Sequence, residues 1–204
     1  MVGVHKHQRF LVISSDLVQS GIRLNVVNLY APNDAVLRRG VWSDLLQIRN
    51  SLPGLWIVMG DFNEVRDSSE RYNSVFVASS VDVFNNFILA ADFHEYNMGG
   101  GRFTFMSDKG DKLSKLDRVL VYGEFKNRWP IASLLALERD CSDHRPLLLS
   151  TVQSDYGHIP FRFYNSWLEI PGFTDYVFTL CGGFKFPDAV DLALATKLRW
   201  LKIV

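Results

Sequence analysis

A run of five apolar residues at positions 55–59, LWIVM, most constrains the fold, because a strand that is apolar at consecutive positions is buried on both faces. Pro53 and Gly54 precede the run and Gly60 follows it. Other strand-like runs lie at 9–13, 22–32, 102–107, 115–122 and 145–151. The segments 35–52 and 79–93 instead repeat apolar residues every three or four positions, which predicts amphipathic helices. The mixture predicts an α/β or α+β class with a largely buried sheet.

Composition narrows the possible functions. The chain has 204 residues, of which 48% are hydrophobic, enough for one globular domain with an appendage. Lys+Arg and Asp+Glu number 22 each, so the chain lacks the general basic excess of a non-specific nucleic-acid binder, although a local basic patch remains open. No apolar run approaches the roughly 20 residues that span a bilayer, and no secretory signal opens the chain. We therefore predict no membrane partner and an intracellular location. The nucleus is one of the compartments that this prediction allows.

The composition changes after residue 152. The segment 153–173 is rich in aromatic residues and prolines, and apolar residues between 189 and 201 follow a helical period with no cap. We predict a first domain at 1–152 and a linker with helices at 153–204, whose packing partner lies beyond the last residue. Cys141 and Cys181 make no metal-type spacing, so we predict that both are reduced packing residues.

Polar residues cluster at the ends of the predicted strands. Asp61 and Asn63 follow the buried strand and flank Phe62, so an extended backbone would turn both polar side chains to one side. Gly60 leaves room for a close backbone approach. Comparable positions are held by Tyr30, Asn33, Asp117, Asp143 and His144. Because groups at strand ends meet in one cleft, we expect these residues to share a site.

Each short motif also has a structural explanation. Gly, Asp and Asn are common turn residues, so GDFN can be a turn. The residues of SDH are consecutive and cannot converge as a serine triad. LDR can be a surface ion pair and YAPN a proline turn. His5 and His7 suggest a metal site, but a mobile N-terminus accounts for them better.

Five segments in order, NLYAPN, VMGDFNE, RFTF, KLDRVLV and SDHRPL, resemble the endonuclease/exonuclease/phosphatase superfamily, whose fold is DNase I-like. More narrowly, they resemble the endonuclease domain of plant LINE-type non-LTR retrotransposons. The likeness covers about 9–152, and PFRFYNSWLEIPGF is similar to the segment that joins this domain to a reverse transcriptase. It implies a four-layer α/β sandwich of two mixed sheets flanked by helices, which acts on DNA.

The resemblance also implies roles at matching positions. Asp61 would align or deprotonate the attacking water, and Asn63 would help to fix it. His144 would contact the scissile phosphate, and Asp117 would hold its imidazole in the required tautomer.

Further implied roles concern the phosphate and a metal. Tyr30 and Asn33 would bind phosphate oxygens, and Thr104 would be a minor neighbour. Asp143 would lie near Mg²⁺ (or Mn²⁺), for which oxygen ligands are suited, and the chain offers no thiolate-imidazole set for zinc.

One departure from the superfamily concerns the main metal ligand. The superfamily brings an asparagine and then a metal-binding glutamate on its first strands, whereas only 29 residues precede Tyr30 here. Glu64 and Glu70 follow GDFN and do not replace that glutamate. We therefore expect an N-terminally truncated retroelement endonuclease whose sheet lacks its first strands.

Two functions stay open: a metal-dependent phosphodiesterase that nicks DNA, and an inactive relic with residual phosphate or nucleic-acid binding. Inositol-phosphate and sphingolipid phosphodiesterases share the core, but the segment after residue 152 favours the retroelement branch.

Overall fold

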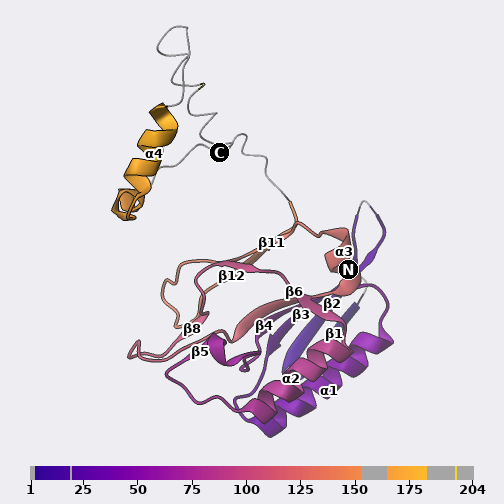
Figure 1. Ribbon diagram of the computed structural model, residues 1–204. Coiled ribbons are helices and arrows are strands. Elements are labelled where there is room, and N and C mark those ends of the chain that lie inside the picture. The colour runs from indigo at the N-terminus through magenta and orange to yellow at the C-terminus, as the bar shows by residue number, and fades with distance from the viewer. Residues whose placement is uncertain (1–2, 19, 153–164, 183–195, 197–204) are drawn as a thin grey trace. The chain divides into compact units, whose positions relative to one another are not determined.

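The computed structural model describes residues 3–18, 20–152, 165–182 and 196. The chain divides into two compact units, Met1–Ser154 and Asp155–Val204. All strands of the described residues belong to the first unit (Figure 1).

A six-stranded mixed sheet forms the centre of the first unit, in the order β1-β2-β3-β4-β10-β6. Its strands are Gly3–Lys6 (β1), Phe10–Asp16 (β2), Arg23–Tyr30 (β3), Leu55–Asp61 (β4), Asp117–Tyr122 (β10) and Phe93–Glu95 (β6). β3 and β4 run parallel, and the other neighbouring pairs are antiparallel. β4 is interior and buried on both faces, as the apolar run predicts.

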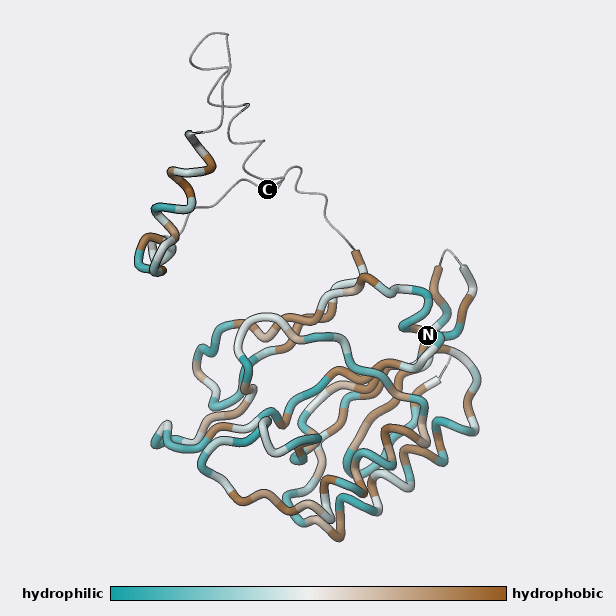
Figure 2. Tube along the Cα trace, viewed as in Figure 1, coloured by the Kyte–Doolittle hydropathy of each residue, from teal (hydrophilic) through white to brown (hydrophobic). Residues whose placement is uncertain are grey.

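Two helices lie side by side on one face of this sheet (Figure 1): α1 (Ala35–Ser51) and α2 (Ala78–Ala90). Asp34 caps α1 by accepting hydrogen bonds from the backbone nitrogens of Val36 and Leu37, both at 2.9 Å. Trp42 of α1 stacks on Phe87 of α2 with ring centroids 5.1 Å apart. Hydropathy alternates along both helices (Figure 2), so an apolar side of each faces the sheet. The helix predicted at 35–52 is confirmed, and the one predicted at 79–93 is confirmed up to Ala90, since Phe93 already belongs to β6.

A three-stranded sheet covers part of the opposite face of the central sheet. Its order is β12-β11-β7, with strands Leu147–Ser150 (β12), Ser133–Ala136 (β11) and Met98–Gly100 (β7). Together with α3 (Gly123–Arg128) it packs on β4 and β10 in a second core. The buried members of this core are Leu55, Ile57, Tyr96, Val119, Val121, Phe125 and Leu134. Packed sheets with helices confirm the predicted α/β class. On β1 and β2 the same face is open, and the side chains of Val4 and Ile13 are 46% and 41% exposed.

A third, small sheet lies near the start of β10. It has the order β5-β9-β8, with strands Arg71–Tyr72 (β5), Leu113–Ser114 (β9) and Phe105–Met106 (β8). A 3₁₀ turn, η1 (Ser68–Glu70), leads into β5. The strand predicted at 102–107 is shorter than expected, since β8 comprises only Phe105–Met106, although the backbone of Thr104 also bonds to Ser114 and Arg145.

Gly100 ends β7 at φ +81°, where a Cβ would lie 2.3 Å from the Ala136 carbonyl oxygen. Two further expectations about the first unit are wrong. The N-terminus is not mobile at residues 3–6, because β1 pairs with β2 and places His5 opposite Val12. Cys141 is an exposed free thiol and not a packing residue.

The second unit contains η2 (Asn165–Glu169) and α4 (Phe173–Gly182). Most of the helix predicted at 189–201 lies outside the described residues, as does the side chain of Cys181. The identity of this unit as a linker to a reverse transcriptase stays a prediction. None of the helices in the described parts of the chain is long and apolar enough to cross a membrane.

Candidate active site

Three predicted site residues lie side by side at one end of the central sheet. In the strand register, Asp61 of β4 is the partner of Tyr30 of β3 and of Asp117 of β10. All three lie at alternating strand positions on the face that packs against the β12-β11-β7 sheet. Ile57 and Val119 lie on the same face. The sheet register therefore brings together residues that are far apart in the sequence.

The turn after β4 holds Asn63 against Asp61. The backbone nitrogen of Asn63 donates to Asp61 Oδ1 (2.8 Å), and its side-chain nitrogen donates to Asp61 Oδ2 (3.0 Å). The sequence predicted an extended backbone at this position. Asn63 instead has φ +50°, and the backbone folds back in a turn that the Asp61 side chain caps. Phe62 does turn to the other side, where it is fully buried in the helix-facing core.

Gly60 permits the close approach of β3 and β4 that this arrangement requires. Its φ is +133°, and a Cβ at this position would lie 2.0 Å from the Leu29 carbonyl oxygen. The predicted role of this glycine is therefore confirmed.

Asp117 and His144 form a hydrogen-bonded pair. His144 Nδ1 lies 2.7 Å from Asp117 Oδ2, with the two side chains 29% and 16% exposed. Thr104, which is fully buried, accepts hydrogen bonds on its hydroxyl oxygen from the backbone nitrogens of Leu116 (3.0 Å) and Asp117 (2.9 Å). Phe105 and His144 form an isolated antiparallel β-bridge, and their ring centroids are 5.1 Å apart. Thr104 and Phe105 thus fix both members of the pair.

The electrostatic surroundings act mainly on Asp61. Burial raises the pKa of its carboxyl, and the negative charges of Asp117 and Asp143 act in the same direction. The hydrogen bond from the Asn63 backbone and the proximity of His144 act to lower the pKa, but the net shift is upward. Asp61 therefore accepts a proton more readily than an ordinary aspartate.

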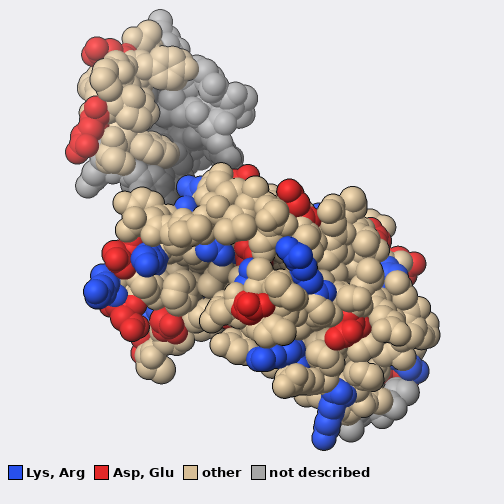
Figure 3. Space-filling model, turned by 90° about the horizontal axis from the view of Figure 1, so that it is seen from below, with Lys and Arg blue, Asp and Glu red and all other residues tan. Residues whose placement is uncertain are grey.

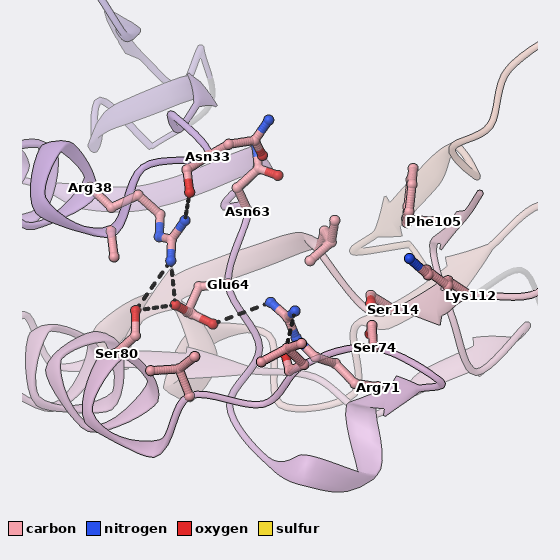
Figure 4. A pocket seen from close by; sticks show the side chains of 14 residues that line it. Asn33, Arg38, Asn63, Glu64, Arg71, Ser74, Ser80, Phe105, Lys112 and Ser114 are labelled. Atoms are coloured by element: carbon pink, nitrogen blue, oxygen red, sulfur yellow. Dashed lines mark hydrogen bonds and ion pairs between the residues drawn. The ribbon is translucent and has the colours of Figure 1, made fainter. Parts of the chain in front are cut away.

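The remaining predicted residues lie at the margin of this group. The Tyr30 side chain is 60% exposed beside Asp61. Asn33 is exposed and lies near Asn63 at one end of a pocket (Figure 4). Asp143 is exposed, and its carbonyl oxygen accepts a hydrogen bond from the Met106 nitrogen.

This pocket, of about 420 Å³, contains residues that the sequence did not single out. At its base, Arg38 Nη2 donates to Glu64 Oε2 (2.6 Å), and Ser80 donates to the same oxygen. Arg71 and Lys112 add two further cations to its wall (Figure 4). No local signal could have revealed the ion pair, because 26 residues separate Arg38 from Glu64.

Glu64 and Glu70 are both engaged away from the site centre. Glu64 is 3% exposed and held by Arg38. Glu70 receives both terminal nitrogens of Arg118, a fully buried side chain that also contacts Glu95 at 3.0 Å. Burial acts to raise the pKa of Glu70, but the hydrogen bonds and charge of Arg118 outweigh it and hold that pKa below its ordinary value.

Comparison with known protein families matches residues 3–144 to the Endonuclease/Exonuclease/phosphatase family. The chain belongs to this family. The match covers more than half of the chain and includes every residue of the predicted site.

Solved structures of similar fold include nucleases and phosphatases. A Neisseria 3′ phosphatase bound to a product DNA hairpin is 18% identical, with a TM-score of 0.53 over 72% of this chain and 65% of that one. An AP endonuclease from Leishmania major is 14% identical, with a TM-score of 0.53 over 69% and 54% of the two chains. The endonuclease domain of TRAS1, a telomere-specific non-LTR retrotransposon, is 14% identical, with a TM-score of 0.50 over 72% and 65%.

These likenesses establish the fold and nothing finer, and they confirm the predicted DNase I-like class. The chain spans between 54% and 65% of the length of the three structures. No curated protein matches the sequence.

Members of the endonuclease/exonuclease/phosphatase family generally depend on a divalent metal. Among the described residues, no three acidic, histidine or cysteine side chains gather as a metal site. The charge of Asp143 nevertheless acts on Asp61, whose pKa it helps to raise. This donor set fits a hard cation that keeps most of its waters and shares its remaining ligands with a phosphate, as Mg²⁺ does.

Proposed function

We propose that this chain carries the phosphodiester-hydrolysing centre of a LINE-type retrotransposon endonuclease that acts on DNA. The single observation that carries the proposal is the Asp117–His144 hydrogen bond of 2.7 Å, formed next to the Asp61–Asn63 turn on one end of the sheet. A carboxylate-oriented imidazole beside a partly buried carboxylate supplies the two groups that phosphodiester hydrolysis requires.

In the proposed reaction, Asp61 aligns the attacking water and accepts its proton. Its raised pKa suits this role, because a base works best when its pKa approaches the working pH. Asn63 holds the Asp61 carboxylate in place through two hydrogen bonds. The water oxygen bonds to phosphorus while the bond from phosphorus to the leaving oxygen breaks.

The phosphate gathers negative charge during this step, and His144 stabilises that charge. Asp117 accepts a hydrogen bond from Nδ1–H, so Nε2 faces the phosphate and donates to it in the imidazolium form, in which both ring nitrogens carry a proton. Tyr30 and Asn33 are proposed to contact other phosphate oxygens. Asp143 would hold a Mg²⁺ or Mn²⁺ ion, and that ion would neutralise part of the phosphate charge.

The retrotransposon origin rests on the ordered motifs and on the segment at 160–173, and the likeness to the TRAS1 domain agrees with it. A reverse transcriptase is then the natural neighbour of the second unit. Sequencing the genomic DNA on both sides of this reading frame tests the origin: an adjoining reverse transcriptase frame is expected, and unrelated coding sequence on both sides would contradict it.

A second candidate is a relic that binds nucleic acid without cleaving it. It is favoured by the absence of a three-ligand metal cluster among the described residues. Nicking of supercoiled plasmid at increasing Mg²⁺ or Mn²⁺ separates the two candidates. We expect weak nicking that requires high metal concentrations and is lost in His144→Ala. Plasmid binding without nicking at any metal concentration would establish the relic instead.

A further inference from the structure

The pocket beside the candidate active site is continuous with it. Asn63 belongs to both, since its side chain holds Asp61 and also lines the pocket. Phe105, on the opposite wall, lies against the ring of His144. A ligand that occupies the pocket therefore lies next to whatever is bound at the Asp117–His144 pair.

A row of strand partners relates the far end of the pocket to the catalytic histidine. Arg71 of β5 is the partner of Ser114 in β9, Ser114 is the partner of Phe105 in β8, and Phe105 bridges to His144. Adjacent strands are about 4.8 Å apart, so the row spans roughly 14 Å. This separation is a few times the 3.4 Å rise of each nucleotide along a DNA strand. One strand can thus reach both positions.

The charges in the pocket favour an anion. Arg38, Arg71 and Lys112 line it against the single carboxylate of Glu64, in a chain whose overall charge is zero. Over the face of the first unit seen in Figure 3, acidic and basic side chains are interspersed, and no excess of cations extends across that face. Glu64 accepts from Arg38 and Ser80 at Oε2 and from Arg71 at Oε1 (3.5 Å), so one carboxylate balances the three cations of the pocket only in part and the pocket keeps a net positive charge (Figure 4).

Buried donors without a hydrogen-bond partner also favour an anion in this pocket. Among the described residues, five buried side-chain polar atoms have no hydrogen-bond partner, and three of them belong to this pocket: Arg38 Nε, Arg71 Nε and Ser74 Oγ. Buried donors are normally paired, so three such atoms around one cavity indicate a missing acceptor. Phosphate oxygens are strong acceptors that bind arginine well.

The size of the cavity distinguishes a nucleotide from a free ion. A volume of about 420 Å³ lies within the range of small-molecule pockets and exceeds what one phosphate ion fills. Val75 and Val77 supply apolar surface on the same wall, which suits a sugar or a base.

We propose that this pocket binds a nucleotide of the substrate DNA strand, with its backbone phosphate at Arg71, Ser74 and Lys112, a few nucleotides from the scissile bond. The proposal rests on the proposed function, because it takes DNA as the substrate. Lys112 supplies a long-range attraction, and Arg71, which is fixed by its hydrogen bond to the Val75 carbonyl oxygen (2.9 Å), sets the position of the phosphate.

Binding of a short fluorescein-labelled single-stranded DNA, measured by anisotropy in EDTA, tests the proposal without metal or turnover. Lys112→Gln keeps most of the side chain and alters an exposed residue, so folding is preserved. We expect several-fold weaker binding and a salt dependence whose slope falls by about 0.7–1. Arg71→Lys, which keeps the charge and loses the fork of donors, should lie between wild type and Arg71→Gln.

Lys126→Gln is the matched control, because α3 follows the end of β10 that lies away from Asp117. It should leave binding and salt dependence unchanged. Equal affinities for wild type, Lys112→Gln and Arg71→Gln would overturn the proposal. Equal losses in Lys112→Gln and Lys126→Gln would also overturn it, since they would indicate a general charge effect. Plasmid nicking with the His144→Ala control decides the proposed function separately, so either idea can fail alone.

Discussion

Asp117 and His144 meet at 2.7 Å across 27 residues of sequence, and the aspartate is in turn fixed by the hydroxyl of a buried threonine. The carboxylate accepts from Nδ1, so the other ring nitrogen is the one presented to a ligand. This relationship determines what the histidine can do.

Asp117→Asn should lower the nicking rate by about 100-fold or more, because a neutral amide no longer stabilises the imidazolium form of His144, which donates from Nε2. Single-turnover nicking measures the effect. Asp108→Asn, an exposed aspartate in the turn before Gly110, is the control and should keep the wild-type rate. A wild-type rate in Asp117→Asn would remove the histidine from the proposed reaction.

The pH dependence of nicking should reflect Asp61. Since the folded-state pKa of Asp61 is raised above 3.8, the fraction of ionised base falls as the pH drops through that raised value. The acidic limb of the rate profile should therefore lie above 3.8. Asp143→Asn removes one of the charges that raise this pKa, so it should shift the limb to lower pH whatever its effect on the maximal rate. A limb that stays in place in Asp143→Asn would contradict the assignment.

Thr104→Val should destabilise the fold and impair the site together. The substitution leaves the backbone N–H groups of Leu116 and Asp117 without their acceptor, at a cost of about 2 kcal/mol. Urea denaturation measures the free energy of unfolding, and nicking measures the displacement of Asp117. Thr104→Ser keeps the hydroxyl and should stay closer to wild type in both assays, and equal losses in both variants would refute a hydrogen-bonding role.

Gly60→Ala should destabilise the chain by about 3 kcal/mol or more, because a Cβ would collide with the Leu29 carbonyl group of β3 and the backbone conformation disfavours it. Gly40→Ala is a matched control inside α1, where a Cβ meets no atom within 4 Å. It should stabilise the chain by about 0.5–1 kcal/mol. Thermal unfolding of both variants gives the comparison, and opposite signs are the expected result.

Arg118→Met should destabilise the fold by about 3 kcal/mol at neutral pH, since it leaves Glu70 and Glu95 without their buried cation. The Glu70 pKa is lowered in the folded state, so its ion pair contributes above the ordinary value of 4.5 and is lost as the pH falls through the folded-state pKa. The difference between variant and wild type should therefore shrink in acid. Urea denaturation across this range checks the trend, and a constant difference would show that lost packing is the cause.

The sequence predicted the parts of this molecule that depend on local pattern. The apolar run of β4 and the periods of α1 and α2 reflect burial at nearby positions, and a single sequence records these directly. The strands β6, β7 and β11 were missed, because they are short and their pairing partners lie far along the chain.

The site was predictable only in part for the same reason. The expected neighbours Asp61 and Asn63 do lie together, but through a left-handed turn and not through an extended strand. The pairing of Asp117 with His144 came from family resemblance and not from local pattern. The ion pairs Arg38–Glu64 and Arg118–Glu70 join distant segments, so no periodicity or spacing could have indicated them.

The register that aligns Tyr30, Asp61 and Asp117 has a kinetic consequence. Tyr30, Asp61 and Asp117 lie on three strands, none of which forms a hairpin with another of the three. His144 contacts Asp117 from a separate loop. Contacts between residues so distant in the chain form late in folding, after local helices and turns. The candidate site therefore has no partially assembled form, and the proposed activity would require the whole topology of the first unit.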